Sequence, residues 1–77
     1  ELMVEGIGLD DDSISNLTVL SHLNTLDISD NPITDTGMGK LSVMKNLHTL
    51  YITGLKTVSE DAINQLSEAL PKCDFYE

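Results

Sequence analysis

Residues 23–33 read LNTLDISDNPI, and the uneven spacing of their apolar residues decides how the chain folds. Leu26 and Ile28 are two residues apart, so they fall on one face of a short strand, with polar residues on the other face. Asn31 can hydrogen-bond nearby backbone through its side chain, and the proline after it cannot donate to a sheet. We therefore predict a short strand and a corner, after which Ile33 turns back toward the core.

The same apolar pattern recurs along the chain at the spacing that separates Leu2 from Leu26, and a third copy follows if one residue is inserted near Lys56. The coinciding positions are Leu2, Leu26 and Leu50; Val4, Ile28 and Ile52; Leu9, Ile33 and Val58; Ile14, Met38 and Ile63; Leu17, Leu41 and Leu66; Leu20 and Met44; Leu23 and Leu47. One unit cannot bury its apolar side alone. We therefore expect three stacked units, 2–25, 26–49 and 50–75.

This repeat resembles that of the leucine-rich repeat family, whose unit reads L-x-x-L-x-L-x-x-N/C-x-L. The middle unit carries the motif in full, from Leu23 to Ile33, whereas the first has Ile7 and the third Leu55 in place of asparagine. The stretches ITDTGMGKL and LPKC are similar to bacterial-type or cysteine-ending repeats. The resemblance covers essentially the whole chain. It implies an α/β leucine-rich repeat solenoid, with parallel strands on the concave face and short helices on the convex face.

Helical periodicity follows the corner in the second unit. Met38, Leu41 and Met44 recur every three residues, and Asp35 or Thr36 can cap a helix that begins there. Two glycines weaken this helix, so we expect it to be short or partly 3₁₀.

A longer helix is predicted in the third unit, where SEDAINQLSEAL offers Ser59 as N-cap and Pro71 as a stop. Its buried stripe is expected to be Ala62, Ile63, Leu66, Ala69 and Leu70. The tail CDFYE predicts a last strand with two registers open: either Cys73 and Phe75, or Phe75 alone, continue the inward column.

Composition narrows the range of functions. The chain has 77 residues, a net charge of -9 and no arginine, so it lacks the basic footprint that nucleic acids and anionic membranes require. A basic protein partner is compatible with this charge. One cysteine excludes an internal disulfide, and no apolar run reaches the roughly 20 residues that span a bilayer.

The first unit begins inside the apolar pattern, at LMVEGIGL, with no polar segment to cover it. We expect residues 1–77 to form the C-terminal part of a longer repeat protein; the alternative is that a partner chain covers this edge. The sequence does not decide the compartment, although bacterial-type repeats favour a secreted or cell-surface location over a cytoplasmic one.

Several reactive side chains are candidates for sites. Asp11, Asp35 and Glu60 hold equivalent places, but residues one unit apart form a ladder and not a calcium cage, so we expect caps of helices and turns. The histidines, His22 and His48, are expected to be exposed, and Cys73 to be a buried hydrophobe. We predict no metal, no cofactor and no enzymatic activity.

The polar face of the strands is the better candidate site. One column holds Met3, Asp27 and Tyr51, which Tyr76 can extend; the next holds Glu5, Ser29 and Thr53; Thr25 and Thr49 flank them. An exposed tyrosine among acids and hydroxyls suits a protein or peptide contact. The resemblance implies a protein–protein interaction module. The alternatives are a structural or capping segment of a larger multidomain protein, and an enzyme whose catalytic domain lies outside these residues.

Overall fold

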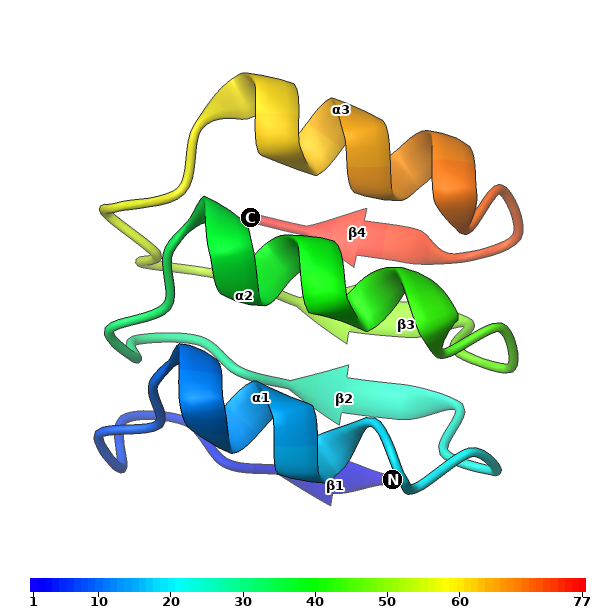
Figure 1. Cartoon of the computed structure of the whole chain (residues 1–77), viewed down its shortest axis with the longest axis horizontal. Helices are drawn as coiled ribbons and strands as arrows, with labels where there is room; N and C mark the ends of the chain where they lie inside the picture. The colour runs from blue at the N-terminus through cyan, green and yellow to red at the C-terminus, as the bar shows by residue number, and fades with distance from the viewer.

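The computed structural model describes residues 1–77 and has two layers, a parallel four-stranded sheet and three helices that all lie on one side of it (Figure 1). The strands follow one another across the sheet in chain order. The elements are β1 (Leu2–Met3), α1 (Asp11–Leu17), β2 (Thr25–Asp27), α2 (Asp35–Lys40), the 3₁₀ turn η1 (Leu41–Val43), β3 (Thr49–Tyr51), α3 (Glu60–Ala69) and β4 (Asp74–Tyr76). This confirms the predicted α/β architecture.

The strand register reproduces the period of the sequence. Leu2 lies opposite Leu26, and Leu26 lies opposite Leu50, so the offset is the same at both pairings. Leu50 then lies opposite Phe75, an offset that is longer by one because the third unit carries the inserted residue. Cys73 is buried as well, at 8% exposed, so both Cys73 and Phe75 turn inward at the last strand.

The helices agree with the sequence in type, with one correction. Ser59 caps α3 by accepting from the Ala62 N–H, and α2 is short and passes into η1, as predicted. The N-cap of α2 is Thr34, however, and not Asp35 or Thr36. The reason is that the Asp35 carboxylate accepts hydrogen bonds from the next unit.

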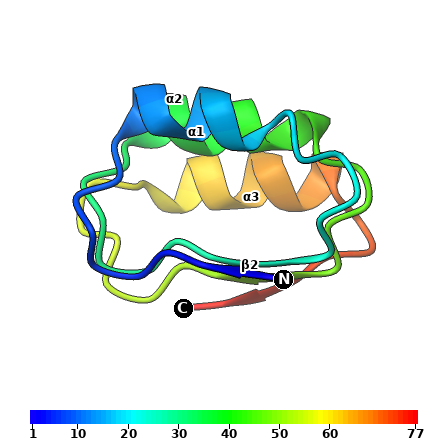
Figure 2. The ribbon, with the colours of Figure 1, turned by 90° about the horizontal axis from the view of Figure 1, so that it is seen from below.

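Burial is greatest in the middle of the stack. Ile28, Ile33 and Leu41 are fully buried, because a neighbouring unit covers them on each side. In the first unit Ile14 alone reaches this state, whereas Leu2, Val4, Leu9 and Leu17 are half-buried. Figure 2 looks along the stack and shows α3 nearer the strands than α1 and α2.

The corner after β2 depends on Asn31, which is 5% exposed. Its Oδ1 accepts from the backbone N–H groups of Ile7 and Leu9 in the unit before it. Its Nδ2 donates to the carbonyls of Val4, Ile28 and Ser29, the first of them also in that unit. One asparagine therefore holds two successive corners, as the sequence predicted for the second of them.

Candidate functional site

The open face is the face of the sheet turned away from the helices (Figure 2). Its side chains fall into three rows. Register places Met3, Asp27, Tyr51 and Tyr76 side by side in one row, and Thr25, Thr49 and Asp74 in a second. Glu5, Ser29 and Thr53 continue the strand alternation in a third. Register thus brings five of the eight residues singled out from the sequence together on this face, and the other three, Glu5, Ser29 and Thr53, lie in the turns that follow β1, β2 and β3.

Asp27 and Ser29 contribute little to the accessible surface of the open face, because they are only 8% and 2% exposed. Asp27 Oδ1 accepts from the Ser29 N–H, at 2.9 Å, and Ser29 Oγ accepts from the Thr53 N–H, at 3.0 Å. Both side chains bend toward the backbone where β2 and β3 end, and their neighbours cover them. Sequence alternation gives the face of a residue but not how far neighbouring side chains cover it.

Two tyrosines form the main aromatic feature of the open face. The rings of Tyr51 and Tyr76 stack, with their centroids 5.1 Å apart and their planes at 22°. Tyr76 is 50% exposed, and Met3, at the far end of the same row, is 56% exposed. The sequence offered Tyr76 only as an extension of this row, because the register of the last strand was open. In the structure Tyr76 is a full member of the row and lies opposite Tyr51.

Three carboxyl groups gather at the corner edge of the open face. The pKa of Glu5 is raised, first by a hydrogen bond with Asp30 and then by the negative charge of Asp27. Asp30 was missed in the sequence because it lies in a turn; its positive φ of 57° carries its carboxylate back over the sheet edge, beside Gly54. We call Glu5, Asp27 and Asp30 the corner acids.

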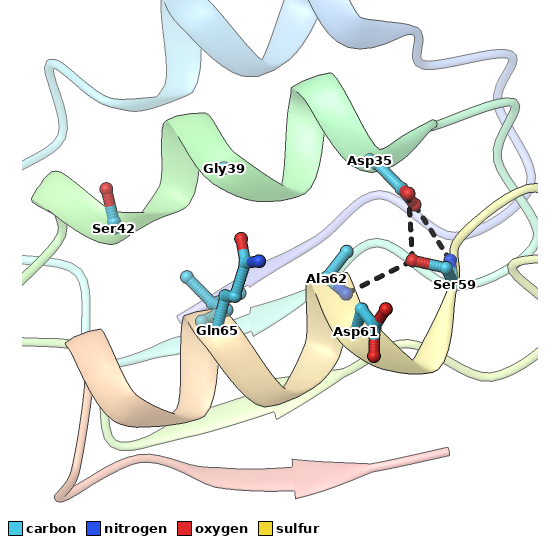
Figure 3. A pocket seen from close by; sticks show the side chains of 8 residues that line it. Asp35, Gly39, Ser42, Ser59, Asp61, Ala62 and Gln65 are labelled. Atoms are coloured by element: carbon cyan, nitrogen blue, oxygen red, sulfur yellow. Dashed lines mark hydrogen bonds between the residues drawn. The ribbon is translucent and has the colours of Figure 1, made fainter.

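On the helix side, an acid in each of two units contacts the start of the next helix. Asp11 accepts hydrogen bonds from the backbone N–H and the hydroxyl of Thr34. Asp35 does the same with Ser59 in the unit that follows (Figure 3). Asp10, not Asp11, caps α1. The expectation that Asp11, Asp35 and Glu60 cap the helices of their units is wrong, because Asp10, Thr34 and Ser59 hold the N-cap positions. Asp11 and Asp35 instead accept hydrogen bonds from the cap residue of the next unit.

A hollow of about 430 Å³ lies between α2 and α3, beside this contact (Figure 3). It exists because Gly39 has no side chain on the α2 wall, and Gln65 of α3 points across toward it. Most of the residues that line it are polar, with Asp35, Ser42 and Asp61 among them. The hollow offers no aromatic or apolar anchor comparable with the tyrosine pair on the open face.

The remaining candidates from the sequence have no special surroundings. His22 and His48 are exposed, as predicted. Burial, and then the nearby charge of Asp74, raise the pKa of the Cys73 thiol, which keeps it in the unreactive thiol form. No group of three or more His, Cys, Asp or Glu side chains is arranged to hold a metal ion.

An apolar edge is exposed at the first unit. Val19 is 76% exposed, and Leu20 and Ile7 are also exposed. Val19 and Leu20 line a shallow hollow with Ser21, His22 and Leu23. The expectation that a further repeat or a partner chain covers this edge stays a prediction.

No helix of the structure has the length and apolar character needed to cross a membrane. The sequence model of a family described as Leucine Rich repeat matches residues 19–42, which include β2 and most of the helical segment after it. No curated protein matches the chain.

Proposed function

We propose that the chain is a leucine-rich repeat protein that presents the open face of its sheet to a protein or peptide ligand. Repeats of this family indicate protein-interaction modules in general. The finer assignment, to this face and to its residues, is our inference. We further propose that the chain binds without catalysing a reaction, and that its partners do not include nucleic acid, because it carries a net charge of -9.

The observation that carries the proposal is the stacked pair of Tyr51 and Tyr76 on a surface that no helix covers. Tyrosine contributes a large contact area together with a polar tip, and it is enriched among residues that dominate binding energy. Met3 extends the same row with an exposed, adaptable thioether. Thr25, Thr49 and Thr53 supply hydroxyls around the row.

A selection from a random peptide library on the immobilised protein tests the proposal. Selected peptides are expected to lose at least about tenfold in affinity against Tyr76→Ala, since truncating an aromatic anchor commonly costs about 2 kcal/mol. Gln65→Ala, on the helix side, is the matched control and should bind normally. Circular dichroism checks that both variants fold. Peptides that lose affinity with Gln65→Ala but keep it with Tyr76→Ala would show that the open face is not the binding surface.

The apolar edge of the first unit favours a second candidate function, a structural segment to which a further repeat is joined. Val19 and Leu20 are exposed there, and the column that holds Leu17 is only half-covered. A repeat stacked on this edge would complete the burial that the middle unit already has.

A fusion tests this candidate: a copy of residues 26–49 placed ahead of residue 2, with Asp10→Thr to supply the hydroxyl that Thr34 supplies one unit later. We expect the fusion to have a higher Tm than residues 1–77 alone and slower amide exchange in β1. If the fused copy leaves both unchanged, the edge does not accept a repeat.

A further inference from the structure

The apolar edge of the first unit continues the junctions that already join the units of the chain. The middle unit has a neighbour on each side, whereas β1 lies at the end of the sheet and the first unit has a neighbour on one side only. Core positions that the middle unit buries completely are therefore half-covered in the first unit. These positions are Leu2, Val4, Leu9 and Leu17, which correspond to Leu26, Ile28, Ile33 and Leu41.

Ile7 adds an exposed apolar side chain to this edge, at the repeat position of Asn31 and Leu55. Asn31 reaches the backbone of the unit before its own, and Leu55 packs, half-buried, against the core. The middle unit precedes Leu55 and satisfies its own corner, because Asn31 also donates to the Ile28 and Ser29 carbonyls. A unit that stacks over Ile7 needs such an asparagine of its own, since isoleucine has no polar group to offer.

On the helix side, one acid and one cap residue close each internal junction. Asp11 accepts from the N–H and the hydroxyl of Thr34, and Asp35 accepts from the same two groups of Ser59. Asp10 holds the cap position of the first unit. Its φ of -111° and ψ of -176° match the -108° and -176° of Thr34, so its N–H takes the same direction, toward the apolar edge.

Asp10 differs from the other two cap residues because it carries a carboxylate where they carry a hydroxyl. Hydrogen bonds from the N–H and the hydroxyl of Ser13 lower the pKa of this carboxylate, so it is charged at neutral pH. An aspartate that faced it, as Asp11 faces Thr34, would bring two negative charges together. An asparagine complements it, since the amide oxygen accepts from the Asp10 N–H while the amide nitrogen donates to the carboxylate.

A second copy of the chain does not meet this requirement. Glu60 holds the place of Asp11 and Asp35 in the last unit, so head-to-tail stacking of two copies would set Glu60 against Asp10. The last unit also closes itself, because Leu66 is buried on the inner side of α3, which lies close to the strands (Figure 2). The unit that fits the apolar edge is therefore a different one.

We infer that the apolar edge docks a further leucine-rich unit that carries asparagine, and not aspartate, at the position of Asp11 and Asp35. The inference rests on the second candidate function and names the chemistry of the partner. The half-covered core positions supply the buried area. The contact at Asp10 selects among units, because like charges that meet across an interface disfavour the wrong partner.

A set of fusions tests this inference, each with a copy of residues 26–49 placed ahead of residue 2. The copy is either unchanged or carries Asp35→Asn, and the edge is either unchanged or carries Asp10→Thr. On the unchanged edge, the Asp35→Asn copy should protect the amide of Asp10 from exchange about tenfold more than the unchanged copy, the effect of one hydrogen bond to a charged group. On the Asp10→Thr edge the unchanged copy should protect this amide at least as well as the Asp35→Asn copy.

Asp35→Ala in the copy is the matched control, since it removes the charge without supplying an amide. It should protect the Asp10 amide less than Asp35→Asn does. Equal protection by alanine and asparagine would overturn the inference. So would stronger protection by the unchanged copy than by the Asp35→Asn copy on the unchanged edge.

The Tm values of the same fusions separate this inference from the candidate function on which it rests. If the unchanged copy raises Tm on the Asp10→Thr edge but the Asp35→Asn copy does not raise it on the unchanged edge, the inference fails and the candidate function stands. If no fusion gains stability, both fail. Sedimentation equilibrium of residues 1–77 should give a monomer. A dimer that Val19→Asp abolishes would identify a second copy as the occupant and overturn the inference.

Discussion

Asp35 accepts two hydrogen bonds from Ser59, one from its backbone N–H and one from its hydroxyl, both 2.8 Å long. Ser59 in turn accepts from the Ala62 N–H, at 3.1 Å, and so begins α3. An acid at the start of one helix thus fixes the residue that caps the next. The contact couples the capping of successive helices to the stacking of the units.

Ser59→Ala removes both the cap of α3 and one donor to Asp35. We expect the free energy of unfolding to fall by about 1–2 kcal/mol, the upper part of the range for loss of an N-cap. Urea denaturation followed by circular dichroism measures this. Ser67→Ala, on the exposed side of the same helix, is the control and should change stability little. Equal effects of the two variants would rule out the capping contact as the cause.

The Asp35 contact also predicts how stability depends on pH. Hydrogen bonds from Ser59 hold the pKa of Asp35 below its ordinary value of 3.8, since they favour the charged carboxylate. The contribution is therefore present above that pH and is lost as the pH falls through the folded-state pKa. Wild type should be more stable than Asp35→Asn at neutral pH, and the two denaturation midpoints should converge in acid. A gap that stays constant down to about pH 2 would contradict this assignment.

Gly37 and Gly39 lie two residues apart in α2, and the structure predicts opposite effects for the same substitution. A methyl group on Gly37 would collide with the Asp11 carboxylate and the Ile33 side chain, whereas nothing lies near Gly39. Gly37→Ala should cost about 1–3 kcal/mol. Gly39→Ala should gain up to about 1 kcal/mol from helix propensity. Thermal unfolding of the two variants decides the matter, and a gain in both would show that Gly37 is not needed for the contact between units.

Asn31→Ala leaves several part-buried backbone groups of two corners without partners. We expect a loss of at least about 2 kcal/mol, because each unsatisfied buried group carries a large desolvation cost. Asn46→Ala is the control, since this exposed amide donates one bond, to the Ser21 carbonyl, and its loss should cost about 0.5 kcal/mol or less. Chemical denaturation measures both. A small effect at Asn31 would mean that water replaces its bonds at little cost.

The sequence predicted the strand and the helix of each unit because these elements depend on the local spacing of residues. Leu26 and Ile28 lie two residues apart, so in any strand they fall on the same face. Ser59 precedes two acidic residues, which is the pattern of a helix start. The rows of the open face followed from the period of the repeat, and the register confirms the two rows that lie within the strands. Asp30 lay outside this reasoning, since its place at the sheet edge depends on a positive φ that its sequence does not require.

By itself, the sequence determined the repeat, the order of strand and helix, and the face on which each strand residue lies, because these depend on the spacing of apolar residues along one coil. Only the tertiary structure decided which carboxylates are buried and what they contact. Asp27 is covered by neighbouring side chains, and Asp35 accepts its hydrogen bonds from the next unit and not from its own helix. Burial and hydrogen bonding between coils depend on the distance between stacked units, and that distance is set by packing across the core and not by the pattern within any one of them.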